Sequence, residues 1–157
     1  MNGPNSNTDL TQKLNDFLEV KQMRKTPERF AILDRIIDIK GHFTIESLML
    51  EMENSKFIVS RATLYNTIDL LLEAQLIRRH SIDGMPTQYE LANTPPHTHL
   101  ICTVCGKLKE VRDNNFIMFM NTRKYTAFTS RYFSLYVYGT CSTCARKRKR
   151  KQLNKKR

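Results

Sequence analysis

The stretch SRATLYNTIDLLL, Ser60–Leu72, has the pattern of a capped, amphipathic helix. Ser60 is a preferred residue for capping a helix N-terminus. After it, apolar residues recur at the spacing of one helix face: Leu64, Ile68, Leu71 and Leu72. Two segments typical of β-strands follow, 77–82 and 87–91, and Asp83-Gly84 between them favours a tight turn. A helix followed by a hairpin predicts the second half of a winged helix-turn-helix domain.

Three further amphipathic helices are predicted upstream of this stretch. The first two carry apolar residues at helical spacing: Leu10, Leu14, Phe17 and Leu18, then Phe30, Leu33, Ile36 and Ile37. Thr26-Pro27 forms a favourable start for the second helix. The segment Phe43-Thr44-Ile45-Glu46 opens a third, short helix that carries Leu48. Residues 1–92 are therefore predicted to form a winged-helix domain.

The segment Asn93-Thr94-Pro95-Pro96 interrupts this pattern, and we expect a hinge at residues 93–96. Beyond it the sequence predicts short strands at 99–102 and 107–111, a helix near 115–124 and an alternating strand at 132–138. Residues 97–144 then form a small second domain of α+β type. The predicted fold class of the whole chain is α+β.

Most of the net charge of +11 lies at the end of the sequence. The last twelve residues, Arg146–Arg157, contain nine Lys and Arg and no acid, which leaves 17 basic residues against 15 acidic ones elsewhere. Self-repulsion predicts a disordered basic tail over residues 145–157 that can bind polyanions. A purely solubilising role is the alternative. The tail alone does not distinguish nucleic acid from a membrane surface.

The apolar runs are short, and the longest, such as Leu70–Leu72, fall far below the roughly 18 residues of a membrane helix. The N-terminus also lacks the pattern of a secretory signal. We therefore expect a cytoplasmic protein with no membrane partner.

The four cysteines form two CxxC pairs, Cys102/Cys105 and Cys141/Cys144. Each pair places two thiolates on a tight turn, and two such turns supply the four sulfurs of a closed tetrahedral zinc site. A closed site has no open coordination position, so this zinc would be structural. Unrelated reduced thiols and a redox CxxC are weaker interpretations, since the spacing is paired on both sides.

Histidines and glutamates indicate a second metal site. His97-Thr98-His99 puts two imidazoles on one side of an extended segment. Glu90 and Glu110 are the candidate oxygen ligands, and His42 precedes the third helix. Nitrogen and oxygen ligands suit Fe(II), Mn(II), Zn(II) or Co(II). From spacing alone only the two histidines of the HxH segment stand out, and His80 does not.

The helix that begins after Ser60 is the candidate DNA-reading element. Ala62 and Asn66 lie opposite its apolar stripe, with Thr63 and Tyr65 on the flanks of that outer face. Small and hydrogen-bonding residues near a helix N-terminus suit the major groove, where an aromatic ring can meet a thymine methyl. An ordinary solvated face is the alternative. Arg61, Arg78 and Arg79 nearby are candidate phosphate contacts.

Taken together, these residues resemble the ferric uptake regulator family, in the same order and over about residues 10–144. The matching segments are Arg24–Arg29, His42–Thr44, Ser60–Tyr65, Tyr89–Leu91, His97–Lys107, Leu135–Gly139 and the second CxxC pair. The resemblance implies a homodimeric, metal-activated transcriptional repressor of metal uptake and homeostasis genes. It implies an N-terminal winged helix, a C-terminal dimerisation domain, iron as the sensed metal, and no enzymatic activity.

The resemblance also implies residue roles. Structural zinc would be held by Cys102, Cys105, Cys141 and Cys144, and the regulatory metal by His42, Glu90, His97, His99 and Glu110. DNA would be contacted by Arg24, Ser60, Arg61, Thr63, Tyr65 and Asn66. Tyr65 corresponds to the family's major-groove contact and Arg24 to a minor-groove contact. Asn66 replaces a common arginine, which changes the expected base preference.

Several alternatives stay open at this point. A zinc-sensing or a peroxide-sensing branch of the same family shares most of these residues, although the peroxide branch favours aspartates where this chain has Glu90 and Glu110. A zinc-ribbon RNA-binding or adaptor protein would explain the CxxC pairs and the basic tail, but not the HxH segment. A zinc nucleobase deaminase would need an HxE segment, which is absent here.

Overall fold

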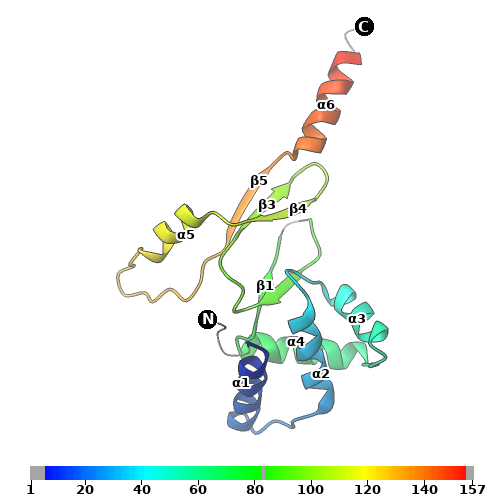
Figure 1. Ribbon diagram of the computed structural model, residues 1–157, viewed down its shortest axis with the longest axis vertical. Helices are drawn as coiled ribbons and strands as arrows, with labels where there is room; N and C mark the ends of the chain where they lie inside the picture. Colours follow the sequence, from blue (N-terminus) through cyan, green and yellow to red (C-terminus); the bar gives the residue numbers. More distant parts are fainter. Residues whose placement is uncertain (1–5, 83, 155–157) are drawn as a thin grey trace. The chain divides into compact units, whose positions relative to one another are not determined.

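The computed structural model describes residues 6–82 and 84–154, which divide into two compact units between Thr94 and Pro95 (Figure 1). The first unit contains α1 (Ser6–Val20), α2 (Pro27–Asp38), α3 (Ile45–Asn54), α4 (Arg61–Glu73), β1 (Ile77–His80) and β2 (Gln88–Leu91). The second contains β3 (Thr98–Cys102), β4 (Leu108–Val111), α5 (Asn114–Asn121), β5 (Leu135–Gly139) and α6 (Ser142–Asn154). The predicted α+β fold class is confirmed. The boundary between the units falls inside the segment 93–96.

The four helices of the first unit enclose its hydrophobic core. Buried side chains come from every helix, among them Leu14 and Leu18 of α1, Leu33 of α2, Leu48 of α3 and Leu64 of α4. These are apolar positions that the periodicity predicts, because one face of each helix repeats every three to four residues. Burying this face supplies most of the stability of such short helices.

The helix starts follow the local capping chemistry. Thr44 accepts a hydrogen bond from the backbone N–H of Ser47, and the Ser47 hydroxyl accepts one from the Thr44 N–H. The Ser60 hydroxyl accepts from the Thr63 N–H at 3.0 Å, as its position before the apolar stripe predicts. α3 and α4 therefore begin where the sequence specifies.

The wing is the antiparallel hairpin β1–β2, in which Arg78 pairs with Glu90 and His80 with Gln88. Gly84 has a φ of +75°, the left-handed conformation expected in the turn, whereas Asp83 lies outside the described residues. Phe43 adds to the hairpin through two backbone hydrogen bonds with Tyr89, of 2.9 and 2.8 Å. This bridge fixes the segment before α3 against β2 and so positions His42.

The second unit is built on a three-stranded sheet with the order β4-β3-β5. β3 is antiparallel to β4 and parallel to β5, and His99 lies opposite Glu110 on one side and Tyr136 on the other. Cys102 pairs with Gly139 at the end of the β3–β5 ladder. The sheet thereby brings the two CxxC segments to the same end.

Large apolar side chains of the second unit are exposed. Within the described residues, α5 has no buried position, and Met118 and Phe119 are exposed on it. Val137 and Tyr138 are exposed on β5, which is an edge strand of the sheet. This unit on its own therefore leaves substantial apolar surface uncovered.

The prediction of a disordered tail over residues 145–157 is wrong for residues 145–154, which continue α6. Figure 1 shows α6 running on from β5 and extending away from the sheet. Alanine, arginine, lysine, glutamine and leucine all have high helix propensity, and here this propensity outweighs charge repulsion. The first turn is also fixed at the second CxxC pair. Residues 155–157 lie outside the described part of the chain.

None of the helices in the described ranges combines the length and apolar character that a membrane crossing requires.

Candidate metal centres and nucleic-acid interface

The four cysteines converge at one end of the second unit's sheet. Their sulfur atoms all lie within 4.8 Å of one another. The backbone brings them together because the Thr103 N–H donates to the Gly139 carbonyl at 2.8 Å, which joins the turn after β3 to the end of β5. Gly106 has a φ of +69°, a conformation that glycine adopts without strain, and it reverses the chain after Cys105.

Hydrogen bonds give the thiols different acidities. Backbone N–H groups, that of Cys141 foremost, lower the pKa of Cys102 to about 6. Side-chain hydrogen bonds with Cys141 and then Cys105 raise the pKa of Cys144 to about 12. A thiolate is the form that binds a metal. Hydrogen bonds also lower the pKa of Cys141, that from the Cys144 backbone foremost. Cys102 and Cys141 are thus the thiols that ionise more readily, whereas Cys144 must lose its proton when a metal cation binds.

This cluster fits a structural zinc site. Four sulfur ligands on two turns match the tetrahedral preference of Zn²⁺, and a complete set of four leaves no open position for catalysis.

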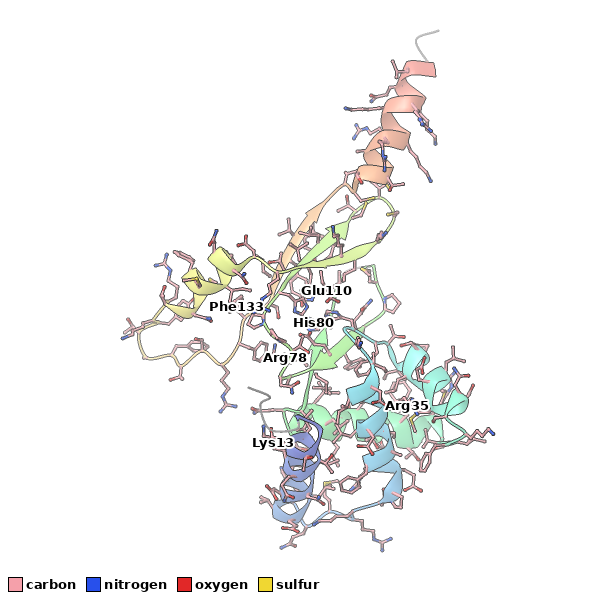
Figure 2. The ribbon with its side chains drawn as sticks, in the orientation of Figure 1. Lys13, Arg35, Arg78, His80, Glu110 and Phe133 are labelled. Carbon is pink, nitrogen blue, oxygen red and sulfur yellow. The ribbon has the colours of Figure 1, made fainter. Side chains whose placement is uncertain are left out.

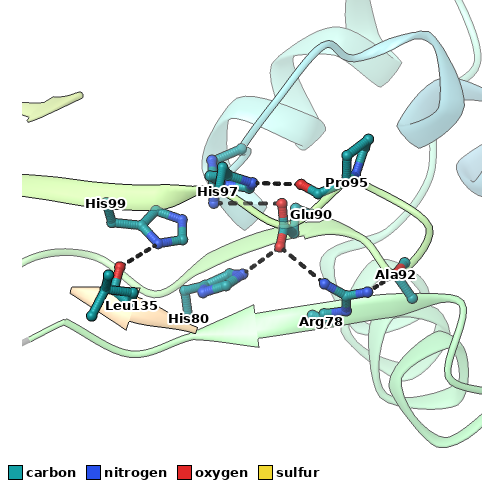
Figure 3. Close-up of polar contacts among 9 residues, drawn as sticks. Arg78, His80, Glu90, Ala92, Pro95, His97, His99 and Leu135 are labelled. Carbon is teal, nitrogen blue, oxygen red and sulfur yellow. Dashed lines mark hydrogen bonds and ion pairs between the residues drawn. The ribbon is translucent and has the colours of Figure 1, made fainter. Parts of the chain in front are cut away.

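A second cluster surrounds the Glu90 carboxylate in the first unit, and Figure 3 shows its main contacts. His80 Nε2 lies 3.0 Å from Glu90 Oε1, and Arg78 Nη1 lies 3.8 Å from the same oxygen. His42 Nε2 lies 3.8 Å from Glu90 Oε2. The side chains of His42, His80 and Glu90 are all at most 4% exposed. The three can together hold a metal ion, since their ligand atoms lie within 4.8 Å of one another.

His80 is the functional candidate that sequence reasoning missed. Its signal is the hairpin register: Arg78 and His80 project on one face of β1, and Glu90 lies opposite Arg78. A diagonal pair across two strands is within reach of long side chains. The register also explains Arg78, which hydrogen-bonds to the Ala92 carbonyl and faces Glu90. Arg78 is therefore engaged within the domain, whereas the neighbouring Arg79 is exposed.

The HxH segment forms a third group, in the second unit. The rings of His97 and His99 have centroids 4.5 Å apart, as alternation along a strand predicts. His97 Nδ1 lies 3.0 Å from the Pro95 carbonyl and His99 Nδ1 lies 3.3 Å from the Leu135 carbonyl (Figure 3). A carbonyl only accepts, so Nδ1 is the donor and Nε2 carries the lone pair in each ring. That tautomer presents Nε2 as a metal ligand.

The five residues expected at the regulatory site thus belong to two described groups. His42 and Glu90 lie in the first unit, whereas His97, His99 and Glu110 lie in the second, where Glu110 pairs with His99 across β3 and β4.

The outer face of α4 is the candidate nucleic-acid interface. Tyr65 is 44% exposed, and Arg61 and Asn66 are also exposed. Ser60 and Thr63 lie at the start of the helix, where their hydroxyls are 2.8 Å apart and serve the cap. The structure thus places the proposed base contacts on one solvent-facing helix.

The expected minor-groove contact, Arg24, lies elsewhere. It is exposed in the loop before α2, and its carbonyl accepts a hydrogen bond from Arg29.

Comparison with known proteins agrees with this architecture. The model of the ferric uptake regulator family matches residues 20–138. The ferric uptake regulation protein of Campylobacter upsaliensis is 32% identical over 148 residues, covering 89% of this chain and 92% of that protein. The peroxide operon regulator of Bacillus subtilis is 26% identical over 126 residues, covering 80% of this chain and 86% of that protein.

Among solved structures, the Helicobacter pylori ferric uptake regulator Fur superposes with a TM-score of 0.69 at 18% identity. The match covers 92% of this chain and 97% of that one, which shows the shared fold. The family model spans both the winged helix and the HxH segment, so the similarity extends beyond the part of the chain that a zinc-ribbon protein would explain. The chain belongs to the ferric uptake regulator family.

Proposed function

We propose that this protein represses metal uptake and homeostasis genes by binding operator DNA as a homodimer when Fe(II) is bound at a regulatory site. The observation that carries the proposal is the division of the ligand set between the two units. His42 and Glu90 belong to one, and His97, His99 and Glu110 to the other. A metal that needs ligands from both units favours one arrangement of the two units over all others.

The energetic requirement is modest. Shifting a two-state equilibrium from about 1% to about 99% takes roughly 5.5 kcal/mol of differential affinity. Several bonds to imidazole and carboxylate ligands are sufficient for this. Nitrogen and oxygen donors suit Fe(II), Mn(II) and Zn(II), and iron is the choice that agrees with the relative named for ferric uptake.

A peroxide-sensing role is the second candidate, because one relative is a peroxide operon regulator. The carboxylates here argue against it. Glu90 and Glu110 are glutamates where the peroxide branch favours aspartates. We therefore place the chain in the metal-sensing part of the family.

The cysteine cluster supports the fold of the second unit. We propose that Zn²⁺ occupies it, held by the four cysteine thiolates, and that it contributes directly to the folding free energy of this unit. Keeping these cysteines out of disulfides needs a reducing compartment, which supports a cytoplasmic location.

The apolar surface of the second unit supports homodimerisation. β5 has an open edge, and Val137, Tyr138, Met118 and Phe119 are exposed on it and on α5. Exposed large apolar side chains and an unpaired strand edge are typical of protein interfaces. A second copy would cover both and present two α4 helices to two half-sites of one duplex.

The proposal is tested by His97→Ala and Glu90→Ala. Each variant is expected to keep one zinc per chain and the dimer, measured by elemental analysis and size-exclusion chromatography. Each should lose Fe(II)-dependent binding to a duplex selected from random sequence by the Fe(II)-loaded parent. Glu53→Ala, which changes an exposed glutamate of α3, is the matched control. Variants that respond to the same Fe(II) concentration as the parent would place the regulatory site elsewhere.

A further inference from the structure

The two units carry charges of opposite sign. Residues 1–94 contain 11 Lys and Arg against 13 Asp and Glu, whereas residues 95–157 contain 15 against two. The formal charges are therefore −2 and +13, which together give the +11 of the whole chain. DNA affinity depends strongly on cations that neutralise phosphates. The winged-helix unit, which carries the proposed recognition helix, has a net negative formal charge, so the net positive charge that attracts a polyanion lies in the second unit.

α6 is the main source of the positive charge. Six consecutive cations, Arg146–Lys151, lie on this helix, and all six are exposed. The sequence contains no acid after Asp113. Among the residues that the structure describes, no carboxylate pairs with any of the six cations. Figure 2 shows nitrogen-tipped side chains projecting from both sides of α6.

The charge pattern of α6 does not match an amphipathic membrane-surface helix. At 100° per residue the six cations spread around the whole helix, and Leu153 is the only large apolar residue after Arg146. An interfacial membrane helix needs a continuous apolar face. A helix charged on every side instead suits contact with DNA phosphates, because that contact requires positive charge and no apolar face.

α6 is also anchored at its start. The Ala145 N–H donates to the Cys141 carbonyl at 2.9 Å, and the Cys141 N–H donates to Cys102 Sγ at 3.3 Å. Three of the cations then line a hollow beside the first CxxC turn, formed by Val104, Thr140, Cys144, Lys147, Arg148, Lys151 and Gln152. The cations are thus held on a fixed helix beside the cysteine cluster.

We propose that α6 binds the phosphate backbone of duplex DNA and supplies sequence-independent affinity. This inference rests on the proposed DNA-binding function and adds a second, electrostatic contact to it. About half of the six cations can face one duplex at a time. Three phosphate contacts give a slope of roughly −2.7 in a plot of log affinity against log salt concentration. A tenfold rise in salt then weakens this contribution roughly 500-fold.

The test compares two triple variants of the full, zinc-containing chain. Lys147/Lys149/Lys151→Gln removes three cations of α6 and keeps good helix formers. Lys13/Lys21/Lys40→Gln removes three exposed lysines of the first unit and is the charge-matched control. Binding to a random-sequence DNA duplex is measured by fluorescence anisotropy over a series of sodium chloride concentrations. Zinc content and helicity are measured for each variant, to show that the second unit stays folded.

We expect the α6 variant to bind random duplex at least tenfold more weakly at low salt and to flatten the salt slope by about one to three. The control should change neither quantity by a comparable amount. Equal losses in the two triple variants, or an unchanged slope in the α6 variant, would overturn the proposal. The proposal would also be overturned if the α6 variant lost binding to phosphatidylserine vesicles but kept its binding to duplex DNA.

Random-duplex binding does not require the regulatory metal. It should therefore persist after Fe(II) is removed, while the cysteine-bound zinc is retained. A failure of the regulatory proposal would instead appear as selected-duplex binding that ignores Fe(II), with the salt slope intact. The two outcomes are separable in the same assay.

Discussion

His80 Nε2 lies 3.0 Å from Glu90 Oε1, and the two side chains are each 2% exposed. This hydrogen bond crosses the wing hairpin from β1 to β2. It orients a carboxylate that we assign to the regulatory metal. A histidine outside the expected ligand set therefore controls one of the ligands.

Replacing His80 should weaken the regulatory site without touching the cysteine cluster. His80→Ala removes the group that orients Glu90, and loss of such a supporting partner typically costs 10–100-fold in metal affinity. We expect this drop in Mn(II) or Fe(II) affinity by anaerobic titration, with the zinc content unchanged. Arg79→Ala, an exposed neighbour on the same strand, is the control. An unchanged affinity in His80→Ala would show that Glu90 holds its position without this bond.

Removing one cysteine should destabilise the second unit. Cys141→Ala takes away a sulfur ligand, and zinc binding to such sites is part of the folding free energy. We expect loss of zinc by elemental analysis and loss of the dimer by size-exclusion chromatography. Ser142→Ala, next to it in the same CxxC segment, should keep both. A zinc-free, folded and dimeric Cys141→Ala protein would contradict the structural assignment.

Zinc affinity at the cysteine cluster should fall as the pH is lowered. Hydrogen bonds raise the pKa of Cys144 to about 12, so at neutral pH this thiol must lose a proton when zinc binds. Each proton released lowers the apparent affinity about tenfold per unit decrease in pH. The pKa of Cys102 is lowered to about 6, so below this pH Cys102 must release a proton as well and the dependence steepens. Competition with a chelator of known affinity between pH 5 and 8 measures it, and a flat profile would contradict the assigned thiol state.

Tyr65 should read bases rather than phosphates. Tyr65→Ala removes an exposed ring on the outer face of α4 and should weaken binding to the selected duplex by roughly 1–3 kcal/mol. Binding to random duplex should stay nearly constant, since phosphate contacts supply it. Tyr65→Phe keeps the ring and separates its contact with a thymine methyl from any role of the hydroxyl. Equal losses on both duplexes would exclude base reading.

The local features of the fold follow from the sequence. Ser60 caps α4, and Gly84 takes the left-handed conformation of a hairpin turn, because capping and turn formation depend on neighbouring residues alone. The paired cysteines were also predictable, since two CxxC turns bring four sulfurs to one metal.

Two features depend on more than local pattern. His80 could be found only from the register of β1 against β2, which decides that it faces Glu90 rather than solvent. The helix over residues 145–154 was missed because charge repulsion and helix propensity oppose each other there. The balance depends on a first turn fixed by Cys141. In both places, a tertiary contact determines the local structure: the pairing of β1 with β2 for His80, and the hydrogen bonds of Cys141 for the helix over residues 145–154.

The run of six cations also makes the folding of α6 sensitive to ionic strength. Arg146 and Arg150, like Lys147 and Lys151, are four residues apart on the helix, and each such like-charge pair opposes helix formation by roughly 0.2–0.5 kcal/mol. Added salt screens this repulsion and stabilises the helix, but it also weakens attraction to phosphates. Raising the ionic strength therefore stabilises the α6 helix but lowers its affinity for DNA. In a complex with duplex DNA, the phosphates neutralise the cations of α6 in place of salt ions. The free α6 helix is therefore most stable at high salt, whereas the DNA-bound helix is most stable at low salt.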